Sequence, residues 1–486
     1  MDFVAITLFL ILYYVRPHEW LTMARSLRFV AFTMVFAIVA TLMRERKFTI
    51  KDVFQTPHDW LMLLYFLWIV GTGPGVSDTM GKVYNVFLYY VVTVQALYRL
   101  RRIQAFLNWW TVMILAVAFV AVLGEYGFSL NDSYDSTHGV MKGRLVLNLS
   151  IFNNPNALGH SITPVLVMLY FICFWKRPIF MKILMIPLLA LPLYCIYLTQ
   201  SKGAFLAGFA AVLTALIYNR PKITQGVILA FALTVGWAGM HLLPRMHELD
   251  KAQSDQAIQG RIAAFTFGRN AMHTLTTGVG YGQFEIEFNK IYKYRKAPHS
   301  SYVGVGAELG KAGLFLFLGL IYCSLRTLIT CKTQNTAEER VRRLLFTLLI
   351  TYIVSSWMVG FAFRATFFLM VASIAAFHRQ MLWGQPAELP TPTLQDRNKD
   401  FAPAIELAGF KPAFAAHAPA TMLNEITVTT PAATAASSTV GAAPTGEAPA
   451  FVPGIRWNRI GFIDVGCILA MTYATDRFWA YIMRNI

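Results

Sequence analysis

A histidine that follows a run of cations is the feature of this sequence whose residue types most clearly suggest chemistry. Residues 290–299 read KIYKYRKAPH, so four cations and two tyrosines lead to His299. Cations suit a phosphate-bearing substrate, and an imidazole can take up a proton near neutral pH. The stretch closes a polar loop of about residues 244–298 in a chain that is otherwise mostly apolar. These residues predict a site for a phosphate-bearing lipid substrate, with His299 as an acid–base group.

The composition places the chain in a membrane. Hydrophobic residues make up 56%, aromatic residues 14%, and the mean hydropathy is +0.50. Such values exclude an ordinary soluble fold. The net charge of +17 lies mostly in short loops at helix ends. This distribution is typical of a membrane protein that is oriented by its positive residues, and not of a nucleic-acid-binding protein. The first apolar run leads to Arg16 without a small-residue cleavage site, so no cleavable signal sequence is expected.

Twelve apolar runs are predicted to cross the membrane, so the expected fold is an all-α polytopic membrane protein. The runs lie near residues 2–15, 29–43, 60–71, 83–98, 104–124, 158–175, 183–199, 203–218, 224–243, 303–325, 341–359 and 364–377. Several are shorter than the roughly 20 residues that cross a bilayer, so they must extend into their flanks.

Basic residues recur on one side of this predicted bundle. The short loops at the ends of the even-numbered spans, or before the eleventh, carry cations at residues 44–47, 99–102, 176–177, 220–222, 340–343 and 378–379. Because positive residues prefer the cytoplasmic side, both termini are predicted to be cytoplasmic. Residues 244–302 then form a large loop on the far side, between the ninth and tenth spans.

Further cations occur on the far side, where the orientation rule disfavours them. In chain order they are Lys142, Arg144, Lys202, Arg261, Arg269 and Arg364. Each one alone could simply extend toward lipid headgroups. As a set they favour a shared anionic ligand. Arg144, Lys202, Arg261 and Arg269 are the predicted phosphate contacts, and Arg364 is a supporting residue.

The C-terminal part differs in composition from residues 1–380, the predicted transmembrane catalytic domain. Residues 381–455 are rich in Pro, Ala and Thr, so they are predicted to be a disordered cytoplasmic linker. Residues 456–486 are apolar but contain Asp464, Asp476 and Arg477, which favours an amphipathic helix in the membrane interface over a thirteenth span. Removal of the tail after about residue 384 is therefore expected to leave catalysis largely intact.

Common motifs for nucleotide or metal chemistry are missing from the sequence. It contains no Gly-Lys-Ser/Thr P-loop, no HExxH zinc motif and no Asp-x-Asp pair. The five cysteines lie in apolar segments or beside a basic loop, without the spacing of a disulfide framework or a metal site. No metal ion and no cofactor are therefore expected.

Four short motifs, in order along the chain, resemble those of the O-antigen ligase/polymerase superfamily of bacterial envelope enzymes. They are FNNPNALG at residues 152–159, QSKGAFLA at 200–207, Arg261 followed by TTGVGYGQF at 276–284, and PHSSYVGVGAELGKAG at 298–313. The N-terminal YVRPHEW at residues 14–20 is also similar to members named as O-glycosylation ligases. Each motif is short, but the ordered set covers about residues 1–380.

The resemblance implies a metal-independent glycosyltransferase of the multi-span, lipid-donor type, with a GT-C-like fold. Such enzymes take a glycan from undecaprenyl diphosphate at the periplasmic face of the bacterial inner membrane. Ligases pass the glycan to a lipid A–core sugar. By position, His299 matches the family's essential histidine and Arg261 its loop arginine. Lys202 stands where arginine is usual and Ser300 where asparagine is common, and a lysine lacks the two-pronged geometry of arginine.

The residue chemistry fits the implied reaction. A base removes the proton of the attacking sugar hydroxyl, and cations stabilise the departing diphosphate. His299 is the predicted base; its structural alternative is to cap the next helix or bond a carbonyl. Glu308 is either a buried acid packed near glycines or a partner that orients a cation or His299. Asn154 and Asn156 either support the site or cap the sixth span.

Three functions remain open at this point. The leading hypothesis is an O-antigen ligase. An O-antigen polymerase or a protein O-oligosaccharyltransferase would use the same donor with another acceptor. A transporter of lipid-linked glycans would place ionisable groups deep in several spans and show an internal repeat. The cations here gather on one side and no repeat is visible, which disfavours the transporter.

Overall fold

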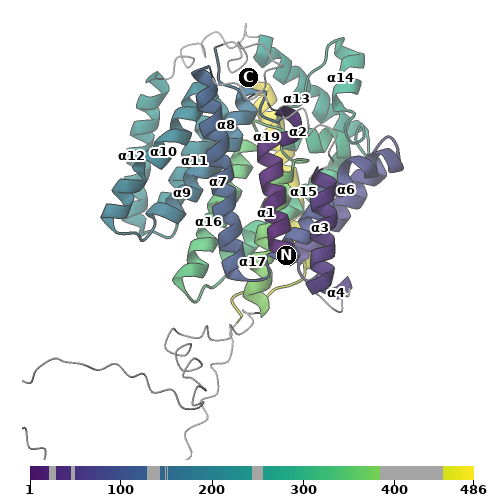
Figure 1. The fold of residues 1–486 in the computed structure, drawn as a ribbon. Helices are drawn as coiled ribbons and strands as arrows, with labels where there is room; N and C mark the ends of the chain where they lie inside the picture. Colours follow the sequence, from purple (N-terminus) through teal and green to yellow (C-terminus); the bar gives the residue numbers. More distant parts are fainter. Residues whose placement is uncertain are drawn as a thin grey trace, which may run out of the picture. The chain divides into compact units, whose positions relative to one another are not determined.

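The computed structural model describes residues 1–20, 29–44, 50–127, 143–147, 149, 151–242, 256–383 and 453–485. Lys142 and residues 384–452 lie outside these ranges, so the predicted linker stays a prediction. The described chain is built almost entirely from helices. Figure 1 shows most of the long helices running side by side in a bundle.

Each of the twelve predicted spans falls largely on a helix. The first six are α1 (Asp2–Val15), α3 (Phe29–Arg44), α5 (Pro57–Thr72), α6 (Val76–Ala96), α7 (Leu100–Glu125) and a divided helix made of α8 (Pro155–Ile162), α9 (Pro164–Leu169) and the π-helical η2 (Tyr170–Phe174). The other six are α10 (Ile179–Thr199), α11 (Lys202–Ile217), α12 (Lys222–Leu242), α15 (Ser301–Thr330), α16 (Thr336–Ser355) and α17 (Ala365–Trp383). The short helices α2 (Pro17–Trp20) and α4 (Ile50–Val53) lie in the connections.

Among the residues that the structure describes, five helical segments are long and apolar enough to cross a membrane by length and composition. They are Leu100–Glu125, Pro155–Phe174, Ile179–Thr199, Ser301–Thr330 and Ala365–Leu382. Four shorter apolar helices accompany them, among them α1 and α11. The chain is thus an all-helical, multi-pass membrane protein over its described residues. A total of twelve crossings and a GT-C-like arrangement stay predictions.

Helix α15 connects most parts of the C-terminal half. It contacts α5, α16, α17 and the helices α13 (Gln256–Thr274) and α19 (Phe462–Asn485). Gly310 has a φ of 67° and breaks the helical backbone of α15, a conformation that residues with a Cβ rarely adopt. The indole of Trp68 donates a 2.9 Å hydrogen bond to the Leu309 carbonyl beside this break. The break therefore lies in a well-packed region and directs the start of α15 toward the polar loop.

The predicted polar loop contains helices of its own. Besides α13, it includes α14 (Phe284–Tyr292), whose Phe284 and Phe288 are buried. Both rings pack edge-on against Phe267 of α13, with centroids 5.2 and 5.6 Å away. Helix α13 also packs along α15. Helices α13 and α14 therefore lie together beside the end of the bundle where α15 begins.

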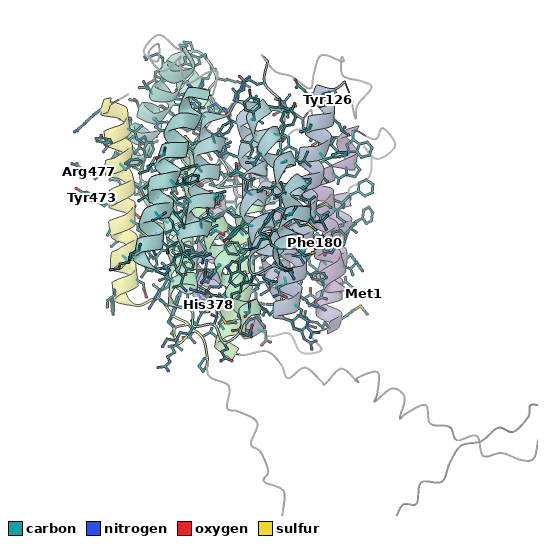
Figure 2. The ribbon with its side chains drawn as sticks, turned by 90° about the vertical axis from the view of Figure 1, so that its left-hand side faces the viewer. Met1, Tyr126, Phe180, His378, Tyr473 and Arg477 are labelled. Atoms are coloured by element: carbon teal, nitrogen blue, oxygen red, sulfur yellow. The ribbon has the colours of Figure 1, made fainter. Side chains whose placement is uncertain are left out.

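The C-terminal helix α19 runs along the length of α15. Near the start of α19, Asp464 accepts a 2.8 Å hydrogen bond from Tyr322 and pairs with Arg326 at 2.7 Å. Near its end, Trp479 is fully buried, and a Cβ placed on Gly306 would lie 3.1 Å from its ring. The two helices are therefore antiparallel, and Figure 2 shows α19, with Tyr473 and Arg477, standing upright beside the bundle.

This packing contradicts the predicted interfacial helix at residues 456–486. A helix lying in the membrane plane could contact α15 only near one of its ends. The polar residues that suggested an interfacial position are used in contacts, since Asp464 binds Tyr322 and Arg326 and Asp476 binds Arg269. The two ends of the chain lie at opposite ends of the bundle (Figure 1), which does not fit the prediction that both termini are cytoplasmic; which end of the bundle faces the cytoplasm stays a prediction.

We expect Trp479→Ala to lower the free energy of unfolding by about 3–5 kcal/mol, the usual cost of removing a buried aromatic side chain. The matched control is Tyr473→Ala on the same helix, because Tyr473 is 66% exposed whereas Trp479 is 0% exposed. Thermal unfolding in detergent distinguishes the two. A chain that ends before Arg456 should be destabilised like Trp479→Ala, whereas the expectation drawn from the sequence concerns only catalysis by the folded enzyme. Equal unfolding temperatures for both point variants would show that α19 is not packed as described.

Candidate functional site

The turn between α16 and α17, residues 356–364, holds the segment that carries His299. The Ser301 amide donates to the Ser356 carbonyl at 2.7 Å, and the Ser300 hydroxyl donates to the same oxygen at 3.1 Å. The Ser301 hydroxyl donates to the Val359 carbonyl and accepts from the Phe361 amide, both at 2.9 Å. These bonds position the two residues after His299 without using the imidazole.

His299 itself is half-buried and has a left-handed backbone, with a φ of 49°. The residue that caps α15 is Ser300, whose hydroxyl accepts from the Val303 amide at 3.4 Å. The structural alternative in which His299 caps this helix is therefore not what the structure has. Burial, with help from the nearby Arg261 and Lys296 charges, lowers the pKa of His299 to about 4. The ring is neutral at pH 7, the form that a proton acceptor needs.

Two cations lie beside His299 and come from different parts of the polar segment. Arg261 is in the first half of α13, and Lys296 follows α14. A Cβ placed on Gly260 would lie 2.9 Å from the Lys296 amine, so this lysine lies against the backbone just before Arg261. Lys296 belongs to the basic run seen in the sequence, but it was not singled out there as a phosphate contact.

The motifs at residues 152–159 and 200–207 pack against each other. A Cβ on Gly159 would lie 2.9 Å from both the Ala204 Cβ and the Thr199 hydroxyl, so α8 and the start of α11 approach closely. Asn154 caps α8, because its side chain accepts from the amides of Asn156 at 2.9 Å and Ala157 at 3.4 Å. Lys202, the first residue of α11, is placed at the same end of the bundle by this contact.

Arg144 supports the same pair of motifs. Its Nε donates to the Thr199 carbonyl and its Nη2 to the Asn156 side-chain oxygen, both at 2.9 Å. Asn156 and Arg144 therefore connect the end of α10 to the start of α8. The predicted phosphate contact of Arg144 stays a prediction.

His160 is a polar residue of this region that sequence reasoning missed. Its Nδ1 lies 3.0 Å from the Ser355 hydroxyl at the end of α16. A Cβ on Gly203 would lie 2.8 Å from its Nε2 and 3.0 Å from the Met358 Cβ, so His160 joins α8, α11 and the α16–α17 turn. Arg261 is close enough to interact electrostatically with both His160 and His299. The available signal was a histidine directly after the FNNPNALG motif.

The glycine-rich motif at residues 276–284 binds α15 through backbone contacts. The Val279 amide donates to the Ala307 carbonyl at 2.8 Å, and the Gly280 amide donates to the Glu308 carbonyl at 2.9 Å. A Cβ on Gly278 would lie only 2.4 Å from the Ala307 oxygen. The Glu308 carboxylate accepts from the Phe284 amide at 3.3 Å, at the first residue of α14. This contact favours the structural alternative for Glu308 over that of a partner to His299.

The structure does not bring Arg269 to His299. Its Nε and Nη2 both donate to Asp476 of α19, at 2.9 and 3.1 Å, and His273 lies 3.0 Å from the same carboxylate. A guanidinium held in this two-pronged pair has little capacity left for a phosphate. The predicted phosphate contact of Arg269 therefore does not fit the geometry. Arg269 instead connects α13 to the C-terminal helix.

Arg364 lies at the end of the α16–α17 turn and is exposed. Its neighbour Phe363 packs edge-on against Tyr281 of the glycine-rich motif, with centroids 5.0 Å apart. Burial lowers the pKa of Arg16, opposed by the charge of Glu19 and assisted by that of Arg364. The YVRPHEW motif is thus near the α16–α17 turn, and Arg16 adds a cation that was not singled out as a site residue.

Within the described part of the chain, no three His, Cys, Asp or Glu side chains are grouped so that they could hold a metal ion. The arrangement instead offers a neutral imidazole beside Arg261 and Lys296, with Lys202 and Arg144 on the adjoining motifs. Such a set can accept one proton and stabilise a concentrated negative charge.

Comparison with known proteins identifies part of the chain. Residues 187–318 match a family model described as O-Antigen ligase. The match runs from within α10 to within α15, so it includes Lys202, Arg261, His299 and Glu308. Arg144, Asn154, Asn156 and Arg364 lie outside it. No curated protein matches the chain.

Proposed function

Because the chain belongs to the O-antigen ligase superfamily through residues 187–318, we propose that it is an O-antigen ligase. In this proposal it transfers a glycan from undecaprenyl diphosphate to a sugar hydroxyl of lipid A–core, at the periplasmic face of the bacterial inner membrane. The family supports a glycosyltransferase-type enzyme with lipid-linked substrates in general. The proposal of transfer with a histidine base rests on the position of His299, which is neutral and half-buried beside Arg261 and Lys296.

The proposed reaction is a direct displacement. His299 accepts the proton of the acceptor hydroxyl while that oxygen forms a bond to the anomeric carbon of the donor sugar. The bond from this carbon to the diphosphate oxygen breaks, and the diphosphate leaves with the electron pair. Arg261, Lys296 and Lys202 stabilise the charge that develops on the leaving group, because charge-assisted contacts strengthen as that charge grows.

The pH dependence of transfer tests the role of His299. A base must be neutral, so activity should fall as the pH drops through its pKa, which is about 4 in the free protein. Bound diphosphate would offset the cations beside the ring and raise that pKa. We therefore expect the acidic limb of kcat, which reports the donor-bound enzyme, to lie at higher pH than the limb of kcat/KM. Coincident limbs, or an acidic limb unchanged in a His299 variant with residual activity, would contradict the proposal.

Transfer is expected to need no divalent metal. The cations carry the leaving-group charge in the proposed mechanism, so addition of EDTA should leave the initial rate within about twofold of the untreated enzyme. The measurement uses purified protein, lipid-linked donor and acceptor, with and without EDTA. Loss of activity in EDTA that magnesium or manganese restores would refute the proposed metal-free mechanism.

The acceptor distinguishes the ligase from its alternatives. Purified protein is incubated with an undecaprenyl-diphosphate-linked glycan and, separately, with lipid A–core, a second glycan donor or a peptide acceptor. A ligase transfers to lipid A–core, an O-antigen polymerase extends the glycan, and a protein O-oligosaccharyltransferase modifies the peptide. Movement of the donor across a vesicle membrane without any covalent product would favour the transporter and refute the enzyme.

A further inference from the structure

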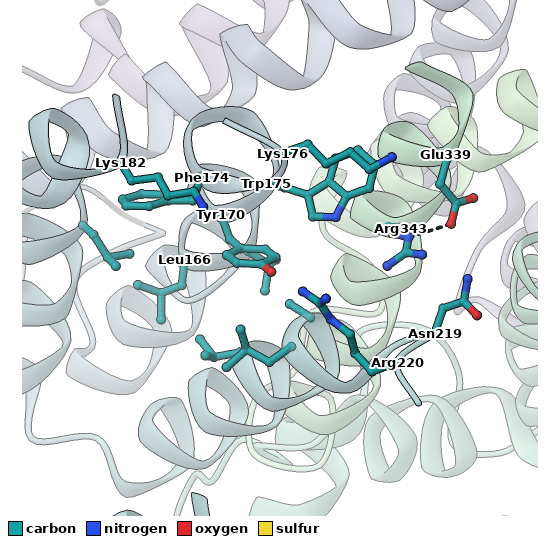
Figure 3. A pocket seen from close by; sticks show the side chains of 15 residues that line it. Leu166, Tyr170, Phe174, Trp175, Lys176, Lys182, Asn219, Arg220, Glu339 and Arg343 are labelled. Carbon is teal, nitrogen blue, oxygen red and sulfur yellow. Dashed lines mark hydrogen bonds and ion pairs between the residues drawn. The ribbon is translucent and has the colours of Figure 1, made fainter. Parts of the chain in front are cut away.

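A cavity lies at the end of α11 that is farther from Lys202. Its volume is about 470 Å³, and it lies among α9, η2, α10, the last turn of α11 and the start of α16 (Figure 3). Lys202 begins α11, whereas Asn219 and Arg220 follow its end. A helix of this length separates the cavity from the proposed active site, so the cavity is not part of that site.

The lining of the cavity has an apolar part and a basic part. Leu166, Leu189 and Val212 contribute the apolar wall. Four cations from separate segments contribute the basic part: Lys176, Lys182, Arg220 and Arg343. Figure 3 shows the guanidinium groups of Arg220 and Arg343 directed toward the space beside Tyr170 and Trp175. A lining of this kind matches a molecule with an apolar chain and an anionic head.

The residues that the structure describes neutralise only part of the positive charge of the cavity. The carboxylate in the lining is Glu339, which binds Arg343 at 2.6 Å and also Arg342 at 2.8 Å. Neither Lys182 nor Arg220 forms an ion pair with a described residue. Lys182 and Arg220 are thus available to a ligand, as is Nη2 of Arg343, whose Nη1 donates to the Tyr218 carbonyl at 3.1 Å.

The backbone around the cavity departs from regular α-helix. Residues Tyr170–Phe174 form a π-helix, in which the Trp175 amide donates to the Tyr170 carbonyl at 2.8 Å. Lys176 follows with a left-handed backbone, at a φ of 53°. Single π-turns inside α-helices occur frequently at functional sites, because they change which side chains face a neighbouring space. Here the π-turn places Tyr170 and Phe174 in the lining.

The helix that closes one side of the cavity faces outward. On α10, Ile179, Phe180 and Ile183 are 71%, 69% and 61% exposed. An apolar surface of this kind in a membrane protein contacts lipid chains. The basic residues at 176–177, 220–222 and 340–343 lie at the same end of the bundle, which the positive-inside rule assigns to the cytoplasmic leaflet.

We propose that this cavity binds an anionic membrane phospholipid. Its phosphate contacts Lys182, Arg220 and Arg343, and one acyl chain lies along Leu166, Leu189 and Val212. Basic pockets between membrane helices on the cytoplasmic side are suited to anionic headgroups, and arginine is a strong partner for phosphate. The proposal concerns the opposite end of α11 from Lys202 and does not depend on the transfer reaction.

Native mass spectrometry of the full-length protein in detergent tests the proposal. Phosphatidylglycerol, phosphatidylcholine, a polyprenyl phosphate and inorganic phosphate are titrated separately. We expect phosphatidylglycerol to bind with a Kd roughly tenfold or more below that of phosphatidylcholine. The double variant Lys182→Gln/Arg220→Gln should raise the Kd for phosphatidylglycerol roughly tenfold or more. Val212→Trp, which fills the apolar part of the cavity without altering its charge, should also weaken the binding of phosphatidylglycerol.

The matched control is Lys222→Gln/Arg459→Gln, which removes two exposed cations that do not line the cavity. It should bind phosphatidylglycerol like the unaltered protein. Equal affinity for both phospholipids, or equal weakening in the control and the double variant, would overturn the proposal. Tighter binding of the polyprenyl phosphate, or displacement of phosphatidylglycerol by equimolar inorganic phosphate, would overturn the assignment to a phospholipid. Glycan transfer is not measured, so the outcome is independent of the proposed activity.

Discussion

Replacement of His299 by alanine is expected to lower the rate of glycan transfer by roughly 10²–10⁴-fold, the usual contribution of a general base. Donor binding should persist, because Arg261 and Lys296 remain. The segment should also stay in place, because Ser300 and Ser301 bind the α16–α17 turn through their own atoms. The measurement is single-turnover transfer with purified, monodisperse protein, together with donor binding by equilibrium titration.

His273→Ala is the matched control for this experiment. His273 is on α13, at the same end of the bundle, but its side chain is 36% exposed and lies against Asp476. The control should transfer glycan at close to the unaltered rate. If His299→Ala folds normally and transfers at the same rate as His273→Ala, His299 is not the base.

Two arginines on α13 should differ sharply in their effect on turnover. Arg261→Ala is expected to lower kcat by roughly 10²-fold, because a charge that stabilises the leaving group acts most strongly in the transition state. Arg269→Ala is expected to leave kcat within about threefold of the unaltered enzyme, since both donating nitrogens of Arg269 are paired with Asp476. Both substitutions remove the same group from the same helix, eight residues or about 12 Å apart.

Stability measurements separate the two roles further. Arg269→Ala leaves Asp476 without its guanidinium partner, so it should lower the unfolding temperature more than Arg261→Ala does. The reverse pattern, with a slow Arg269 variant and a fully active Arg261 variant, would move the diphosphate toward α19. That result would contradict the proposed site while leaving the family assignment intact.

The helices could be predicted from the sequence because burial and lipid contact both need apolar residues. The first and last residues of a helix were harder to predict where capping or tertiary contacts determine them. Helix α16 begins at Thr336 and not near residue 341, since the Asn335 side chain accepts from the Glu338 amide at 2.9 Å. It ends at Ser355 and not near residue 359, where the following residues bind Ser300 and Ser301. The Asn335–Glu338 spacing was a readable signal that hydropathy alone overlooks.

The grouping of His299 with Arg261 could be expected from motif order, but the partners of single charges could not. Arg269 and Arg261 look alike in the sequence, and only the fold reveals that Asp476, far along the chain, binds one of them. The Glu308 carboxylate likewise binds the backbone amide of Phe284. Every residue except proline has such an amide, so the sequence does not reveal which one a side chain will bind. The position of α19 was missed because its charged residues Asp464 and Asp476 pair with other helices. A prediction from composition assumes that such residues face water.

The antiparallel course of α19 along α15 has a practical consequence for experiments on cells. The end of α19 lies on the side of Gly306 and α13, where His299 is found. If His299 faces the periplasm, as proposed, a protein fused after Asn485 is expected to emerge in the compartment that contains the proposed glycan substrates. A reporter enzyme that needs export would fold and function there, whereas a tag that needs the cytoplasm would remain silent. Fusions designed on a count of apolar runs alone would choose the wrong reporter.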